Sequence, residues 1–164
     1  MANTDILIKE GELDISQTSV FNFYEFYTTT KTWFKDNGYI HIEKEYEEII
    51  KGKTKDVNIK WNGDKKFDDY TKAIIKVEIK LSDSNQIENK KEKLTKGKLK
   101  ISFSANMVTD YEDKINSPVG KLWRGLQEKF FSPHKRFKFE KEIKEDTYAL
   151  YNRIKSFLNI EKYN

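Results

Sequence analysis

The chain contains no cysteine, and this absence removes several kinds of chemistry at once. Without thiols the protein cannot form disulfides, bind metals through thiolates or use a cysteine nucleophile. Its two histidines, His41 and His134, lie far apart and form no metal-ligand pair. The sequence also has no glycine-rich phosphate loop and no G-x-S-x-G segment. These absences favour a protein without catalysis, without a cofactor and without a bound metal.

Long apolar runs are missing as well. No stretch approaches the roughly 18 apolar residues that a membrane-spanning helix needs. Residues 1–5 lack the basic segment and the apolar run of a signal peptide. We therefore expect a cytoplasmic protein without a membrane span.

Charge and aromatic rings are abundant instead. Charged residues make up 35% of the 164 residues and aromatic residues 14%. A chain of this length is near the usual size of one domain, so we expect a single domain over residues 1–164. Residues 1–51 hold ten acidic and five basic side chains, whereas residues 52–100 hold eight and fourteen. The charge is uneven, but it does not reach the dense positive field typical of nucleic-acid binders.

Two segments, residues 75–81 and 99–107, place an apolar residue at every second position. Side chains on a strand alternate between two faces, so both segments are predicted to be half-buried strands. Strands are expected over residues 39–51, 55–62, 70–82 and 98–109, with a short strand or hairpin around Gly11. Asn62-Gly63 predicts a tight turn, and the polar residues 82–97 predict a long, mobile hairpin loop.

Helices are expected at both ends of the chain. Thr18 or Ser19 can cap a first helix that stops at Asn37-Gly38. Ser117-Pro118 is a typical helix start and Pro133 a typical stop, and a last helix is expected over residues 140–158. The predicted fold is a two-layer α+β domain: an antiparallel meander sheet of four to five strands, with one N-terminal and two C-terminal helices on one face.

The other face of this sheet is expected to be wet. It should carry the polar residues that alternate with the apolar ones, including Glu78 and Lys80 on the third long strand and Glu43, Glu45 and Glu47 on the first.

Glu78-Ile79-Lys80, with Asp69 upstream, resembles the PD-(D/E)xK motif of metal-dependent nucleases. Two carboxylates can hold a divalent cation while the lysine steadies the attacking water. The proline is absent here, and the strand is followed by another strand where that family continues into a helix. Alternating charges on a solvated strand face give the same pattern, and this interpretation is favoured.

A basic cluster with interleaved aromatic residues lies near the C-terminus. Its charged members are Lys129, His134, Lys135, Arg136 and Lys138. Such a pattern can hold phosphates and stack bases, or lie at an anionic membrane surface. The favoured alternative is that Phe137 and Phe139 anchor a linker to the core while the charges stay solvated.

The first helix is apolar around much of its circumference, because residues 21–27 contain five aromatic side chains. It is either wedged into the core or partly exposed as the wall of a ligand cavity or a partner surface. The candidate residues for such a surface are Phe23, Phe26, Tyr27, Trp33, Trp61 and Trp123.

These observations favour a non-catalytic binding module that contacts a protein partner or a second copy of itself. The layout is also similar to that of helix-grip ligand carriers, in which a sheet wraps a C-terminal helix. That similarity implies a small apolar ligand held among Trp61, Val77, Ile101 and Phe103. A nucleic-acid-associated protein and a nuclease are the remaining alternatives.

Overall fold

The structure is a computed structural model that describes residues 2–88, 91–111 and 133–163. Its centre is one five-stranded sheet in which all neighbouring strands are antiparallel. The strands, in chain order, are β1 (Asn3–Phe21), β2 (Ile40–Lys51), β3 (Thr54–Lys66), β4 (Thr71–Glu88) and β5 (Lys93–Thr109). Their spatial order is β1-β5-β4-β3-β2. This confirms the prediction of an α+β fold with an antiparallel sheet.

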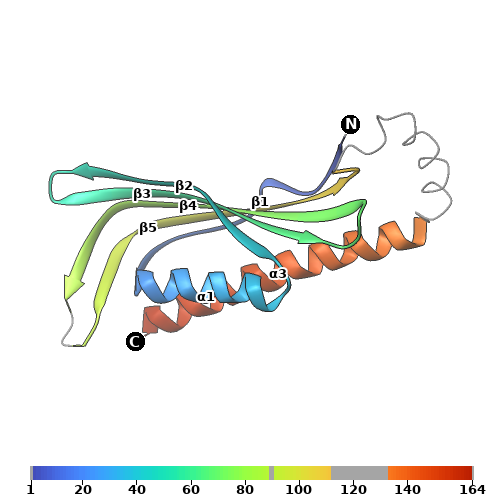
Figure 1. The fold of residues 1–164 in the computed structure, drawn as a ribbon. Helices are drawn as coiled ribbons and strands as arrows, with labels where there is room; N and C mark the ends of the chain where they lie inside the picture. The colour runs from blue at the N-terminus through green and yellow to red at the C-terminus, as the bar shows by residue number, and fades with distance from the viewer. Residues whose placement is uncertain (1, 89–90, 112–132, 164) are drawn as a thin grey trace.

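Two helices pack on the sheet and lie along the same side of it in Figure 1: α1 (Phe23–Asp36) and α3 (Pro133–Tyr163). The 31 residues of α3 make a helix about 46 Å long. No helix in the described part of the chain is both long and apolar enough to cross a membrane.

The bounds of both helices differ from the predicted ones. Thr18 and Ser19 belong to β1, and α1 is capped by Asn22, whose side-chain oxygen accepts a hydrogen bond from the Glu25 N–H at 3.1 Å. The predicted stop is confirmed, since Gly38 follows the helix with a φ of +81°. Pro133 begins α3 instead of ending a helix, as suits a residue without an N–H at the first helical position. The rest of the helix predicted over residues 117–133 lies outside the described residues.

Asn62-Gly63 is not a turn but the middle of β3, where Gly63 pairs with His41 on one side and Ile75 on the other. A Cβ built on Gly63 would lie 2.3 Å from Cε1 of Phe34. Glycine is present because the Phe34 ring approaches the strand backbone. The β2–β3 turn lies instead at Gly52-Lys53, between the paired residues Lys51 and Thr54, and Gly52 has a φ of +62°.

The hairpin loop predicted over residues 82–97 is largely strand. Pairing between β4 and β5 continues to Glu88 and Lys93. A register shift between Ser82 and Asn85 breaks the alternation there, so a period-two pattern could not be read through it. The apolar runs on either side of Gly11 are likewise not a hairpin, because both pair with β5.

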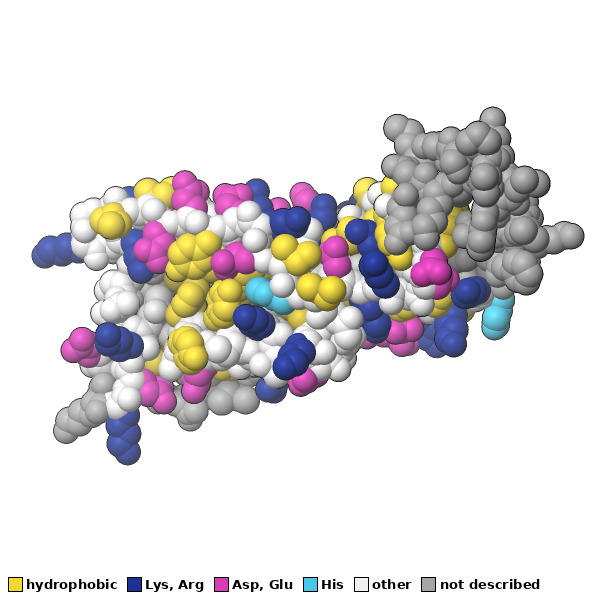
Figure 2. All heavy atoms as spheres, in the orientation of Figure 1, with side chains coloured by type: hydrophobic (Ala, Val, Ile, Leu, Met, Phe, Trp, Pro, Cys, Tyr) yellow, Lys and Arg dark blue, Asp and Glu magenta, His cyan; other side chains and the backbone are white. Residues whose placement is uncertain are grey.

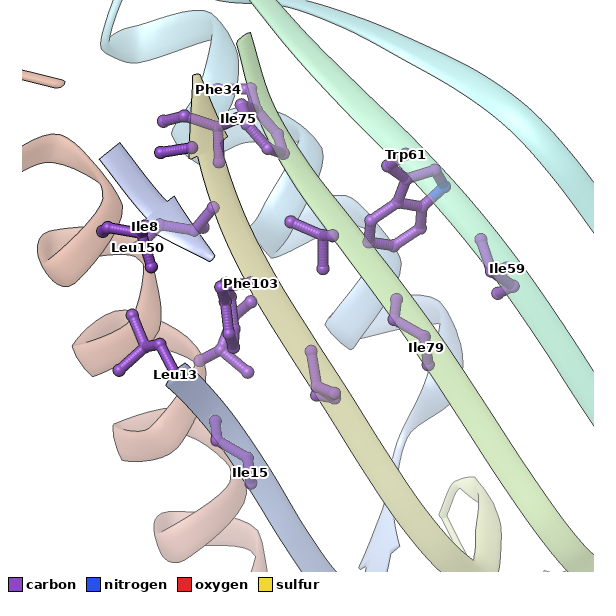
Figure 3. Packing of buried hydrophobic residues seen from close by; sticks show 14 of the residues in the cluster. Ile8, Leu13, Ile15, Phe34, Ile59, Trp61, Ile75, Ile79, Phe103 and Leu150 are labelled. Atoms are coloured by element: carbon purple, nitrogen blue, oxygen red, sulfur yellow. The ribbon is translucent and has the colours of Figure 1, made fainter. Parts of the chain in front are cut away.

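The core fills the space between the sheet and the helices (Figure 3). Every second residue of β3, β4 and β5 points into it, as predicted from the alternation. The long helix α3 adds a stripe of apolar residues four or seven positions apart. The buried members of that stripe are Phe139, Ile143, Leu150, Ile154 and Leu158.

A bulge in β2 divides its charged residues between the two faces of the sheet. The pairing shifts between Glu43, which lies opposite Trp61, and Glu45, which lies opposite Lys60. Trp61 faces the core and Lys60 faces solvent, so Glu43 shares the face that the helices cover. The prediction that Glu43 lies on the outer face with Glu45 and Glu47 is therefore wrong, because one extra residue reverses the alternation.

Candidate binding surface

Aromatic side chains gather where the start of α1 meets β2 and β3. Tyr27 of α1 packs edge-on against Trp61 of β3, with ring centroids 5.1 Å apart. His41 of β2 packs against the same indole at 5.0 Å and against Tyr27 at 6.0 Å. In Figure 2, hydrophobic side chains surround a histidine near the middle of this face. Tyr27, His41, Glu43 and Trp61 form what we call the aromatic cluster.

Glu43 is the polar member of the aromatic cluster. Its Oε1 accepts a hydrogen bond from Nε1 of Trp61 at 3.3 Å and one from the hydroxyl of Tyr27 at 3.4 Å. Burial of the phenol, together with the nearby Glu43 carboxylate, raises the pKa of Tyr27. Glu43 thus orients two aromatic side chains while it remains exposed to solvent.

His41 lies half-buried behind these groups. Burial, and then the positive charge of Lys31, lower the pKa of His41. The imidazole is therefore neutral near pH 7. Its Nε2 atom is buried and has no hydrogen-bond partner among the residues that the structure describes.

The edge strand β2 continues this surface beyond the helix. It is the last strand of the sheet, so one side of its backbone pairs with no other strand among the described residues. Four of the nine large hydrophobic residues found exposed in the described part of the chain belong to it. They are Ile40, Tyr46, Ile49 and Ile50, of which Ile50 is 78% exposed.

Tyr46 is fixed on this strand by its neighbours. Its hydroxyl donates to Oε1 of Glu48 at 2.8 Å, and the same oxygen lies 3.3 Å from Nζ of Lys55. Burial, followed by the hydrogen bond to Glu48, raises the pKa of Tyr46 to about 12. The phenol is therefore un-ionised over the physiological range and keeps the proton that it donates to Glu48.

The predicted surface residues do not all come together. Phe26 lies under the aromatic cluster and is fully buried, with its ring 6.2 Å from Trp61. Phe23 is half-buried beside Phe26. Trp33 lies further along α1 and stacks on Tyr39 at 6.0 Å. Trp123 lies outside the described residues.

Four members of the basic cluster, from His134 to Lys138, lie in α3 and not in a linker, and two of them have partners in the fold. Arg136 contacts Asp5 of β1 at 2.7 Å and Glu140 at 3.0 Å. Nζ of Lys135 lies 3.1 Å from Asp68 in the β3–β4 turn. His134 and Lys138 are exposed, and Lys129 lies outside the described residues. Much of this charge therefore attaches α3 to the sheet.

Asp68, the partner of Lys135, is held in place by further hydrogen bonds. Burial acts to raise the pKa of Asp68, but hydrogen bonds from the N–H groups of Tyr70 and Thr71, together with Lys135, outweigh it and hold the pKa below its usual value. Of the two predicted phenylalanine anchors, Phe139 stacks on Phe67 at 4.4 Å and Phe137 is exposed.

The three nuclease candidates are not brought together. Asp69 lies in the turn before β4, while Glu78 and Lys80 lie within that strand. The seven residue-to-residue steps from Thr71 to Glu78 span about 23 Å of extended chain. Carboxylates that share a metal ion each approach it to about 2–2.6 Å. No group of three acidic or histidine side chains placed to hold a metal occurs in the described part of the chain.

Sequence reasoning missed Glu43 as a partner of Trp61 and missed the exposed edge of β2. The bulge in β2 hid the first, since strict alternation assigns Glu43 to the outer face. The second follows from the strand order, which no short pattern encodes. Comparisons of the chain with protein-family models, with curated proteins and with solved structures found no match.

Proposed function

We propose that the protein is a non-catalytic binding module that captures a protein partner at the edge of β2, beside the aromatic cluster. The observation that carries the proposal is the concentration of exposed apolar side chains on β2, which lies at the edge of the sheet that the structure describes. A strand of this kind offers backbone N–H and C=O groups to an added strand, and its side chains supply specificity.

Two carboxylates of β2 indicate which side chains a partner would carry. Glu47 accepts a hydrogen bond from Asn58, and neither Glu43 nor Glu47 makes an ion pair within the described residues. An extended segment with apolar residues beside the isoleucines and a basic residue on each of its two faces would match Glu43 on the helix-covered face and Glu47 on the outer face. Such a segment can belong to another protein or to a second copy of this chain.

A carrier of an apolar ligand is less well supported. Trp61, Val77, Ile101 and Phe103, the expected walls of its cavity, are all 0% exposed. Essentially none of their surface borders a space that could admit a water molecule. Native mass spectrometry of the untagged protein distinguishes the two functions, since a carrier retains a reproducible small-molecule mass and a self-associating module gives a discrete oligomer.

The direct test compares two matched double variants. Tyr46→Ser with Ile50→Ser alters the β2 surface, whereas Tyr148→Ser with Ile6→Ser removes a tyrosine and an isoleucine elsewhere. Tyr46 and Tyr148 are 45% and 50% exposed, and Ile50 and Ile6 are 78% and 62% exposed. Quantitative affinity purification from source cells should show the same proteins on the wild type and the control pair, and their loss from the β2 pair. Equal recovery on all three would overturn the proposal.

A further inference from the structure

Where β4 pairs with β5, the outer face of the sheet carries three lysines close together, and Glu78 is the next residue on that face of β4. Lys80 of β4 and Lys100 of β5 are directly paired across neighbouring strands. Lys98 lies two residues from Lys100 on the same face. Like charges directly opposite each other destabilise a sheet, so this arrangement is unfavourable unless something else binds to it.

Two other lysines on the same face have carboxylate partners. Nζ of Lys60 lies 3.2 Å from Glu45, and Nζ of Lys72 lies 3.7 Å from Asp64. By contrast, Lys80 and Lys100 make no ion pair within the part of the chain that the structure describes. Lys98 lies 3.4 Å from Asp83, but both side chains are largely exposed, and such a pair contributes little.

The same lysines border an open hollow of about 390 Å³. Its lining has no carboxylate, and it includes hydroxyl groups from three positions. Ser16 lies opposite Lys100, and Thr18 lies opposite Lys98 on β1, while Ser82 lies opposite Lys98 on β4. Three lysines and three hydroxyl-bearing residues thus line one hollow from three adjacent strands.

We propose that this hollow binds phosphate groups of an anionic ligand, at a site separate from the β2 edge. Each lysine supplies a positive charge without fixed geometry, and each hydroxyl can donate to a phosphate oxygen. A phosphate would relieve the repulsion between Lys80 and Lys100. The phosphates can belong to a small molecule or to the backbone of a nucleic acid, and the experiment separates these sources.

The test uses two probes and two triple variants of the full chain. The probes are inorganic pyrophosphate, followed by NMR shifts of backbone amides, and a fluorescein-labelled single-stranded thymidine 12-mer, followed by fluorescence polarisation. The site variant replaces Lys80, Lys98 and Lys100 by glutamine. The control variant replaces the exposed residues Lys9, Lys44 and Lys53 by glutamine. It therefore changes the net charge by the same amount as the site variant.

For the oligonucleotide, three phosphate contacts predict that affinity falls about 20-fold between 50 and 200 mM salt. The site variant should lose at least about tenfold in affinity and most of this salt dependence, while the control variant retains both. Pyrophosphate shifts at the three lysines without oligonucleotide binding would support the site and assign it to small phosphates. Binding of neither probe, or equal loss in both variants, would overturn the proposal.

Discussion

Replacing Gly63 by alanine tests the packing of α1 against the sheet. The added Cβ would lie 2.3 Å from Cε1 and 2.5 Å from Cδ1 of Phe34, so the buried ring must move by about 1 Å to restore ordinary contact distances. Overpacking of this kind costs about 1–3 kcal/mol. Alanine also restricts the unfolded chain, which favours folding by about 0.4–1 kcal/mol. We therefore expect Gly63→Ala to lower the free energy of unfolding by up to about 2.5 kcal/mol.

The cause is isolated by repeating the substitution in a Phe34→Ala background. Without the ring, the steric term disappears and only the effect on the unfolded chain remains. Gly63→Ala should then be neutral or stabilising by up to about 1 kcal/mol. Urea denaturation followed by circular dichroism measures all four proteins. Phe34→Leu replaces Phe34→Ala if the latter is too unstable, and it should give the same sign with a smaller coupling.

Gly52→Ala is the matched control. Gly52 has a φ of +62° and open space around its Cβ position, so alanine there should cost about 1–2 kcal/mol whether or not Phe34 is present. If Gly63 were in a turn with positive φ, its substitution would behave in the same way. An equal cost of Gly63→Ala in both backgrounds would therefore refute the placement of Phe34 over β3.

Three further predictions concern charged groups. Glu43→Gln should lower the pKa of Tyr27, and to a smaller extent that of Tyr46, because it removes a nearby negative charge. Absorbance at 295 nm would detect this as earlier tyrosine ionisation, and an unchanged titration would contradict the contact. Proton NMR should place the pKa of His41 below 6.5, and this pKa should rise in Lys31→Gln. The unfolded chain binds a proton at His41 more readily than the folded chain does, so His41 lowers the free energy of unfolding as the pH falls below about 6.5. Asp68→Ala should cost about 1–3 kcal/mol in urea denaturation, since two backbone N–H groups of the β3–β4 turn lose their acceptor. The wild-type Asp68 contribution is present above the unfolded pKa near 3.8 and is lost as the pH falls through the lower folded value.

The fold class could be predicted because β4 and β5 are half-buried strands with few interruptions in their centres. Residues 75–81 and 99–107 alternate in sequence, and their apolar members are buried in the structure. The helix stop at Gly38 could be predicted for a similar reason, since it depends only on local backbone conformation. Patterns fail where a tertiary contact decides the residue. Asn62-Gly63 has the sequence of a turn, yet Gly63 lies in a strand and leaves room for the ring of Phe34 in α1.

The candidate surfaces could be predicted only in part, because they depend on register. Tyr27 and Trp61 were predicted as members of one surface, and the structure places their rings 5.1 Å apart. Glu43 joins them only because the bulge beside Lys44 turns it to the same face. The Lys80–Lys100 pair arises from the alignment of β4 with β5, and the isolation of β2 arises from the order of all five strands. Alternation along one strand shows that a residue is exposed, but the neighbouring strand determines whether a charge meets an opposite charge, a like charge or open solvent. The two proposed sites therefore depend on how the strands pair, and the pattern along a single strand does not reveal that pairing.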